Sequence, residues 1–293
     1  MPNFSKNLTL TLARLLASSL QRLGDYDVEG LARHYGQHRE RSEVGRLAFF
    51  SKCLAIEFYG ITNEAAVNGE AWLIRRTAGL GFKTIFDVGA NVGDWAGLAL
   101  ASHPAARLHC FEIVPSTFAA LQKNLSSHLA RCVLNPFGLS DGAGTVKIYL
   151  NPTSNLVSSM YTFGDASKWE TVDGELQSGS AYVQAHGIEH IDYLKIDVEG
   201  AEALVLKGLV PELAAGKIRL LHFEYNRGAL ESRFLLKDFY ALLQPLGFCL
   251  GKLYPHGVMF QDYRWDLEDF VGPNYVACRK DDAEMIALLK IAA

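Results

Sequence analysis

The sequence predicts an α/β protein with a doubly wound, mostly parallel sheet. From Lys83 onward, short apolar runs rich in β-branched residues alternate with segments of helical periodicity, which is typical of strand–helix–strand units. The first apolar run, 84–88, passes directly into a glycine-containing turn and then a predicted helix. Because doubly wound sheets build nucleotide sites at such a strand–turn–helix junction, this run also indicates where a ligand would bind.

The elements of the sheet domain follow from these apolar runs and from the turn residues between them. Strands are predicted at 84–88, 107–111, 131–135, 192–196, 217–223, 248–254 and 274–279, and helices at 93–102, 115–127, 181–187, 201–208, 233–244 and 281–291. The alternating segment 145–150 follows two glycines, which favours an antiparallel ribbon. Residues 151–180 are rich in Ser, Thr, Gly and Asn, and we expect them to form a loop excursion on the substrate side.

Residues 1–78 lack strand signals and are predicted to be a helical extension of the domain at 79–293. Apolar residues recur there at helical spacing in two sets, Leu12, Leu15, Leu16 and Leu20, then Leu47, Phe50, Leu54 and Phe58. The apolar stretch 8–20 contains Arg14 and lacks a convincing cleavage site, so an amphipathic docking helix is favoured over a secretion signal. No run reaches the ~20 apolar residues of a membrane span. The extension could serve as a substrate lid or as a homodimerisation arm.

Composition excludes several classes of function. The 293 residues carry a net charge of −4, and no run of Lys and Arg exceeds two residues, so we expect no nucleic-acid partner. The five cysteines are scattered without a C-x-x-C pair, so neither a zinc cluster nor a disulfide framework is indicated. Unpaired cysteines fit a reducing cytoplasm, where we expect the protein to reside.

The turn after the first strand differs from a dinucleotide-binding turn. It reads G-A-N-V-G, with Asn91 where the second glycine of G-x-G-x-x-G would stand. Acidic residues precede the turn at Asp87 and follow it at Asp94. Two acids and an amide suit a ligand with a cationic ammonium group and no phosphates, such as S-adenosylmethionine (SAM), better than NAD, FAD or ATP. The residues predicted to hold the methionine part are Asp87, Gly89, Asn91, Gly93 and Asp94.

Two further strand ends are predicted to complete the cofactor site. Glu112 ends the second strand about 20 residues beyond the turn, where a carboxylate can accept hydrogen bonds from both ribose hydroxyls. Ser140 and Asp141 follow the third strand and could accept a hydrogen bond from the adenine amino group. An aspartate before Gly142 also suits a simple turn, so this assignment has a structural alternative.

Carboxylates gather at two later strand ends. Asp197 and Glu199 lie where a buried strand gives way to a helix, and Glu202 suits the first turn of that helix. The next strand ends in His222 and Glu224, which alternation places on one face together with Asn226. If these strands are neighbours, Asp197, Glu224 and Asn226 meet at the crevice. They could then supply a general base, an ammonium site, or an oxygen-rich site for a divalent cation such as magnesium.

Four segments together carry a resemblance to a known family. FDVGANVGDW, HCFEIVPSTFAALQKNL, GLSD and above all YLKIDVEGAEALVLKG resemble the FkbM family of SAM-dependent methyltransferases, over roughly residues 84–226. The resemblance implies a Rossmann-like class I fold with a seven-stranded sheet and methyl transfer, typically to hydroxyl groups of sugars, glycolipids or macrolide-type products. The upstream Asn68-Gly69-Glu70 also resembles a segment found before this domain, and we expect Glu70 near the methionine end of SAM. Residues 151–180 and the segment GELQSGSAYVQAHG depart from the family pattern, so the acceptor is least defined.

The resulting hypothesis is a SAM-dependent O-methyltransferase acting on a small molecule or glycoside. The predicted base is Asp197 first, then Glu224 and His222, and magnesium could assist. Three alternatives remain open: an N-methyltransferase whose acids at 197 and 224 seat an amine, a non-catalytic SAM-binding protein, and an NAD(P)-dependent oxidoreductase. The last is disfavoured by Asn91 and by the lack of an obvious Tyr-x-x-x-Lys pair.

Overall fold

The computed structural model describes residues 18–19, 21–22, 25–59, 64–150, 158–162, 169–270 and 273–291. The chain divides into two compact units, Met1–Ala55 and Ile56–Ala293. The sequence places the boundary at residue 78, and the division into a helical extension and a sheet domain at that residue stays a prediction.

The first unit contains helix α2 (Asp25–Gly36) and most of helix α3 (Ser42–Tyr59). Leu47, Phe50 and Leu54, which helical spacing places together on α3, are all exposed. The predicted amphipathic helix at 8–20 lies almost entirely outside the described residues. None of the described helices combines the length and apolar character needed to cross a membrane.

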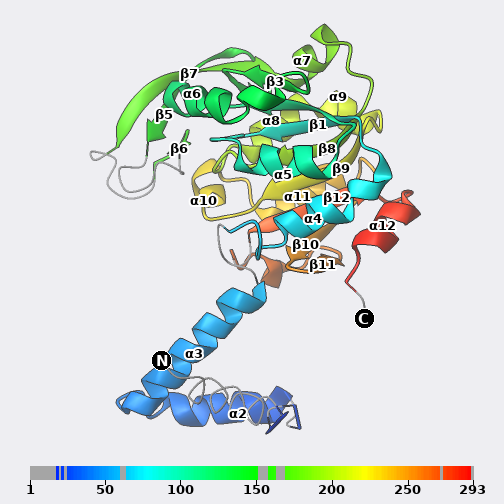
Figure 1. Cartoon of the computed structure of the whole chain (residues 1–293). Coiled ribbons are helices and arrows are strands. Elements are labelled where there is room, and N and C mark those ends of the chain that lie inside the picture. Colours follow the sequence, from blue (N-terminus) through cyan, green and yellow to red (C-terminus); the bar gives the residue numbers. More distant parts are fainter. Residues whose placement is uncertain are drawn as a thin grey trace. The chain divides into compact units, whose positions relative to one another are not determined.

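The second unit is organised around one large sheet of eight strands in the order β11-β10-β12-β9-β8-β1-β2-β3 (Figure 1). The strands are β1 (Thr84–Val88), β2 (Arg107–Phe111), β3 (Cys132–Asn135), β8 (Ile191–Ile196), β9 (Ile218–Glu224), β10 (Phe248–Tyr254), β11 (Gly257–Phe260) and β12 (Asn274–Arg279). β3, β2, β1, β8 and β9 are parallel neighbours, whereas β12 is antiparallel to both β9 and β10. The strand order reverses between β1 and β8, and such a switch point opens a crevice at the carboxyl ends of the strands.

The expected count of seven strands is wrong by one. The additional strand, β11, pairs antiparallel with β10 through a short turn in which Tyr254 and Gly257 face each other. Only four residues long, GVMF, it gives too short an alternating pattern to identify a strand from sequence.

Helices cover both faces of the sheet, as expected for a doubly wound fold (Figure 1). One hydrophobic core lies under α4 (Glu70–Arg76), α5 (Asp94–Ser102), α6 (Pro115–Asn124) and α12 (Ala283–Leu289). The other lies under α7 (Gly179–Ala185), α8 (Glu202–Gly208), α9 (Val210–Ala214) and α11 (Leu236–Leu243). Strand β1 serves both cores, since Phe86 and Val88 face the second and Ile85 faces the first. Shorter helices are η1 (Ala78–Leu80), η2 (Ser126–His128), α10 (Gly228–Ser232) and η4 (Trp265–Leu267).

A second, smaller sheet of four strands has the order β4-β7-β5-β6. It consists of β4 (Gly138–Ser140), β5 (Gly144–Leu150), β6 (Ser158–Ser159) and β7 (Glu170–Ser178). The antiparallel pairing of β5 with β7 confirms the predicted ribbon. The loop predicted through residue 180 is wrong for β7 and for the start of α7. Of the nine residues of β7 only Gly174 is buried, so the apolar alternation that identifies a strand is absent and backbone pairing defines it.

Candidate active site

A pocket of about 290 Å³ lies at the carboxyl ends of β1, β2, β8 and β9, next to the switch point. Among the residues predicted from the sequence, its lining includes Glu70, Gly89, Asn91, Asp94, Glu112, Asp197 and Glu224. Five other predicted residues are not part of the lining: Asp87, Gly93, Ser140, Asp141 and His222. The structure therefore gathers most of the predicted cofactor residues and the two acidic strand ends around one cavity.

The turn after β1 packs tightly against the end of β8, which explains its first glycine. Gly89 has φ +83°, and a Cβ atom there would lie 1.8 Å from the carbonyl oxygen of Asp197. The backbone N–H groups of Gly89 and Ala90 both donate to the carbonyl of Phe111, at 3.0 and 2.9 Å. Gly93, with φ +95°, packs against Leu121 instead of lining the pocket. Only glycine tolerates both the backbone conformation and the close approach at position 89.

Glu112 is held in place by the same turn. Its Oε2 accepts a hydrogen bond from Asn91 N at 2.9 Å, and its Oε1 accepts one from Val114 N at 2.8 Å. The residue is only 6% exposed, and this burial raises the pKa of the carboxyl despite the two backbone hydrogen bonds. Both oxygens are thus fixed in the pocket wall, where their remaining lone pairs could accept hydrogen bonds from ligand hydroxyls.

Asp87 and Asp197 share the buried ammonium group of Lys195. The Lys195 Nζ atom lies 3.4 Å from Asp87 Oδ1 and 3.3 Å from Asp197 Oδ2. Burial lowers the pKa of Lys195, but the two carboxylates more than offset this, so the pKa is raised and the side chain stays charged. Asp87 is fully buried, and burial raises the pKa of its carboxyl. Within the described chain, neither Asp87 oxygen has a hydrogen-bond partner.

The segment Asn68-Gly69-Glu70 places a further carboxylate at the pocket. Asn68 Oδ1 accepts from Glu70 N at 3.0 Å, which fixes the start of α4. A Cβ at Gly69 would lie 2.6 Å from the carbonyl oxygen of Tyr254, and its φ of +101° also requires glycine. The predicted position of Glu70 beside the cofactor turn is compatible with this geometry, because Glu70 and Gly89 line the same cavity.

Ser140 and Asp141 lie away from the cavity, in contrast to the sequence-based expectation. Ser140 is buried where β4 packs against α8, with its carbonyl oxygen 1.9 Å from the position of a Cβ at Gly208. Asp141 is exposed, and it accepts a hydrogen bond from Ser140 Oγ at 3.2 Å. The pocket is instead lined by Gly138 and Leu139 from the same strand. This strand therefore reaches the cavity through its apolar residue and not through the predicted polar ones.

His222 is buried beneath the pocket. Its Nε2 lies 2.9 Å from Asn274 Oδ1 and 3.7 Å from Glu70 Oε1, and its Nδ1 lies 3.3 Å from the hydroxyl of Tyr193. Burial lowers the pKa of the imidazole, although Glu70 and Asn274 act in the opposite direction. With both ring nitrogens already engaged, His222 is suited to orienting Glu70 and Asn274.

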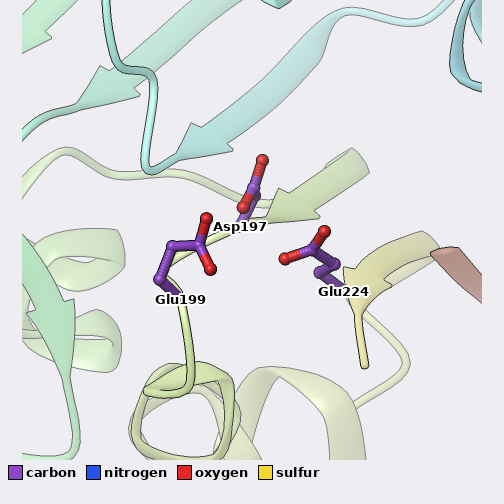
Figure 2. Close-up of side chains that lie close together, drawn as sticks. All are labelled: Asp197, Glu199 and Glu224. Carbon is purple, nitrogen blue, oxygen red and sulfur yellow. The ribbon is translucent and has the colours of Figure 1, made fainter. Parts of the chain in front are cut away.

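Three carboxylates converge on one side of the pocket. Figure 2 shows Asp197 and Glu199 from the segment after β8 facing Glu224 from the end of β9. One oxygen of each carboxylate lies within 4.8 Å of one oxygen of each of the other two. Asn226 Nδ2 donates to Glu199 Oε2 at 3.0 Å and to Glu224 Oε2 at 2.6 Å. Glu199 is not among the catalytic residues predicted from the sequence. The signal available was its position in the K-I-D-V-E-G string, two residues beyond Asp197.

The charges of this cluster shift its protonation equilibria. Burial, followed by the charge of Asp197, raises the pKa of Glu199 to about 7. Burial and the charges of Asp197 and Glu199 raise the pKa of Glu224 well above its usual value. Such an oxygen set could hold a hard divalent cation. The same three carboxylates already interact with the Lys195 ammonium and the Asn226 amide, which offset part of their charge without an ion.

Glu202 fixes the turn that carries this cluster. Its Oε1 accepts from Val198 N at 3.1 Å, and its Oε2 accepts from Gly200 N at 3.0 Å. The helix α8 begins at Glu202, which confirms the predicted first-turn acid. Burial raises the pKa of this carboxyl to about 7, although its backbone hydrogen bonds oppose the shift.

The strand order and the position of the pocket define a Rossmann-like methyltransferase fold. The family model for the methyltransferase FkbM domain matches residues 87–250, which is more than half of the chain. The protein therefore belongs to the FkbM methyltransferase family.

Several relatives have named activities. Over 160 residues the chain is 32% identical to methyltransferase sdnD of Sordaria araneosa, covering 44% of this chain and 61% of the relative. Over 152 residues it is 29% identical to the 31-O-demethyl-FK506 methyltransferase FkbM of Streptomyces tacrolimicus, covering 43% and 58%. It is also 28% identical over 198 residues to the 2-O-methyltransferase NoeI of Sinorhizobium fredii, covering 59% and 75%. The chain spans less than two thirds of the length of the first two relatives.

A solved structure of a methyltransferase FkbM from Methylobacillus flagellatus aligns with 80% of this chain and 59% of its own. The TM-score is 0.45 and the sequence identity is 13%.

Proposed function

We propose that the protein is a SAM-dependent O-methyltransferase that acts on a hydroxyl group of a small molecule or glycoside. The observation that carries this proposal is that one cavity brings the glycine turn and Glu112 together with the carboxylates of Asp197, Glu199 and Glu224. The first set suits a nucleoside with an amino-acid tail, and the second suits proton transfer from an acceptor. The names of two relatives, an O-demethyl-FK506 methyltransferase and a 2-O-methyltransferase, support the choice of an oxygen acceptor.

The pocket fits SAM in the chemistry of its walls. Glu112 is a fixed, buried carboxylate in the pocket wall, which supports its predicted role as acceptor for the ribose hydroxyls. Ile113 and Leu139 offer an apolar surface for adenine, a role that we reassign from Ser140 and Asp141. Glu70 provides negative charge for the methionine ammonium group. Of the other residues predicted for the methionine site, Gly89, Asn91 and Asp94 line the pocket. Asp87 and Gly93 belong to the same strand–turn segment but do not line the pocket.

The reaction transfers a methyl group as a cation. An acceptor oxygen attacks the methyl carbon in line, the carbon–sulfur electrons return to sulfur, and the hydroxyl proton passes to a base. The protein must therefore hold the oxygen and the methyl carbon about 3–3.5 Å apart and supply that base. Asp197 and Glu224 line the cavity, which supports their predicted role near the acceptor, whereas the position of His222 outside it does not.

The second sheet forms part of the cavity lining. Ile148 of β5 and Leu176 of β7 lie next to Ile113, so they extend the apolar surface proposed for adenine. Met160 follows Ser159, which donates to the carbonyl oxygen of Glu199, so an acceptor with one hydroxyl toward the carboxylates could place an apolar face against Met160.

An N-methyltransferase is the second candidate, because the same carboxylate cluster would bind a cationic amine. The test is incubation of the purified protein with methyl-labelled SAM and a panel of glycosides, macrolide alcohols and primary amines. Each reaction is run with magnesium and with a chelator, and products are identified by mass spectrometry. Methyl ethers support the proposal and methylated amines support the alternative. SAM binding with no turnover on any member of the panel supports a non-catalytic protein.

Three further proposals concern the protein in the cell. A cytoplasmic location is supported by the five cysteines, all of which are free. The absence of a nucleic-acid partner stays a prediction from the net charge of −4. Homodimerisation through the N-terminal helices stays a prediction, and analytical ultracentrifugation of the full chain would test it.

A further inference from the structure

We propose that the carboxylate of Glu199 accepts the proton of the acceptor hydroxyl, in place of Asp197, Glu224 or His222. The inference rests on the proposed function and names the base within it. It is supported by the backbone conformation of Glu199 in the segment after β8 and by the contacts of that side chain.

The backbone at Glu199 is strained and held by fixed partners. Its φ is +52°, a conformation that residues other than glycine rarely adopt. The Glu202 carboxylate accepts hydrogen bonds from the N–H groups on either side, those of Val198 and Gly200. Ser159 Oγ, from the second sheet, donates to the carbonyl oxygen of Glu199 at 2.6 Å. Strained backbone persists only where its surroundings enforce it, and here they place the side chain in the lining of the cavity.

The side chain of Glu199 is oriented but keeps one oxygen for a ligand. Its Oε2 accepts from Asn226 Nδ2 at 3.0 Å, and Asn226 is itself fixed because its Oδ1 accepts from Gly228 N at 2.7 Å. Within the described part of the chain, no hydrogen bond or ion pair reaches Oε1. A carboxylate with one oxygen anchored and the other open can accept a proton without rearrangement.

The competing groups are less suited to accept this proton. Asp197 is paired with the buried Lys195 ammonium at 3.3 Å, so its Oδ2 is already engaged by a cation of the protein. Glu224 already accepts a hydrogen bond from Asn226 Nδ2 at 2.6 Å, and burial and the neighbouring carboxylates raise its pKa well above the usual value. His222 does not line the cavity, and burial lowers the pKa of its imidazole.

The protonation equilibrium of Glu199 agrees with this geometry. The groups that face it are the charged Asp197 and Lys195, the carboxyl groups of Glu224 and Glu202, and the neutral side chains of Asn226 and Ser159. Burial, followed by the charge of Asp197, raises the pKa of its carboxyl to about 7, although Asn226 and Lys195 oppose this shift. A general base is most effective when its pKa lies near the working pH.

The step balances without another reactant. As the oxygen–methyl bond forms and the methyl–sulfur bond breaks, the acceptor proton moves to Glu199 Oε1. The products are the methylated acceptor, S-adenosylhomocysteine and a protonated Glu199, which then releases its proton to solvent.

Calorimetry with two probes tests the assignment without a known acceptor. The first probe is S-adenosylhomocysteine. The second is its analogue in which an amine-bearing carbon replaces sulfur, so that a cation occupies the place of the transferred methyl group. The variants are Glu199→Gln, Asp197→Asn and Glu224→Gln, with Glu189→Gln, exposed at the opposite edge of the sheet, as the control.

We expect Glu199→Gln to weaken binding of the amine probe roughly tenfold, because a nearby carboxylate charge is removed. Its affinity for S-adenosylhomocysteine should be unchanged, which also shows that the variant is folded. If Asp197→Asn or Glu224→Gln selectively weakens binding of the amine probe and Glu199→Gln does not, the assignment is wrong. If the wild-type protein binds neither probe, the proposed function itself fails. With a hydroxyl acceptor from the screen, the wild-type kcat/KM should rise with pH through about 7 and this dependence should vanish in Glu199→Gln.

Discussion

The ammonium group of Lys195 lies 3.3 Å from the carboxylate of Asp197 and 3.4 Å from the carboxylate of Asp87 on the neighbouring strand. This arrangement connects the acid before the glycine turn with the acid that follows β8. One buried cation thus contacts the acids of both proposed halves of the site, the cofactor side and the acceptor side.

Removal of this cation should strongly destabilise the protein. Lys195→Met leaves the fully buried Asp87 without its counter-charge, and breaking a buried ion pair from one side costs about 3–5 kcal/mol. The measurement is the free energy of unfolding in urea. The matched control is Lys147→Met, which removes an exposed ion pair with Asp173 and should cost less than ~1 kcal/mol. Equal effects of the two variants would show that Lys195 does not have this role.

Gly89→Ala should disrupt the cofactor turn. Its φ of +83° and the carbonyl oxygen of Asp197, 1.8 Å from the new Cβ, leave no room for a methyl group, so we expect a loss of more than ~2 kcal/mol. Gly97→Ala is the matched control, because Gly97 lies inside α5 with open space around its Cβ position. That variant should gain about 0.5–1 kcal/mol in stability. A tolerated alanine at position 89 with normal cofactor binding would contradict the close packing of the turn against β8.

The pH dependence of stability should change in Glu202→Gln. The folded-state pKa of Glu202 is raised from 4.5 to about 7, so its contribution to stability is present below 4.5 and is lost as the pH rises through about 7. The glutamine variant lacks this titration. Its stability relative to the wild type should therefore increase between about pH 5 and about pH 8. Urea unfolding at several pH values measures this difference, with Glu189→Gln as control. A difference that is constant with pH would contradict the raised pKa.

The first half of the sheet could be predicted because the local sequence pattern determines its strands and turns. The strands at 84–88 and 107–111 have the predicted bounds, since predominantly apolar segments end there at Gly89 and Glu112. Gly89 and Glu112 were identifiable because a glycine turn and an acid one strand later are set by local backbone geometry and spacing. Both line the cavity.

The differences between prediction and structure arise from contacts with residues far away in the chain, which the local sequence pattern does not indicate. β7 is held by backbone pairing with β5, and its side chains carry almost no burial pattern. Polar character suggested Ser140 as a cofactor contact, but packing against α8 turns it away and presents Leu139. His222 lies on the same strand as Glu224, but its Nε2 is engaged by Asn274 on β12 and its side chain does not line the cavity. Each outcome depends on a partner far away in the chain.

Isothermal titration of the full-length protein with S-adenosylhomocysteine tests the central claim most directly. We predict one-to-one binding with a dissociation constant on the order of micromolar. Glu112→Gln should weaken this binding by about tenfold, because a charged acceptor of ribose hydrogen bonds is lost. The control Glu175→Gln, on exposed β7, should bind like the wild type. Absence of binding by folded wild-type protein, or equal affinity in Glu112→Gln, would contradict the assignment of this pocket to the cofactor.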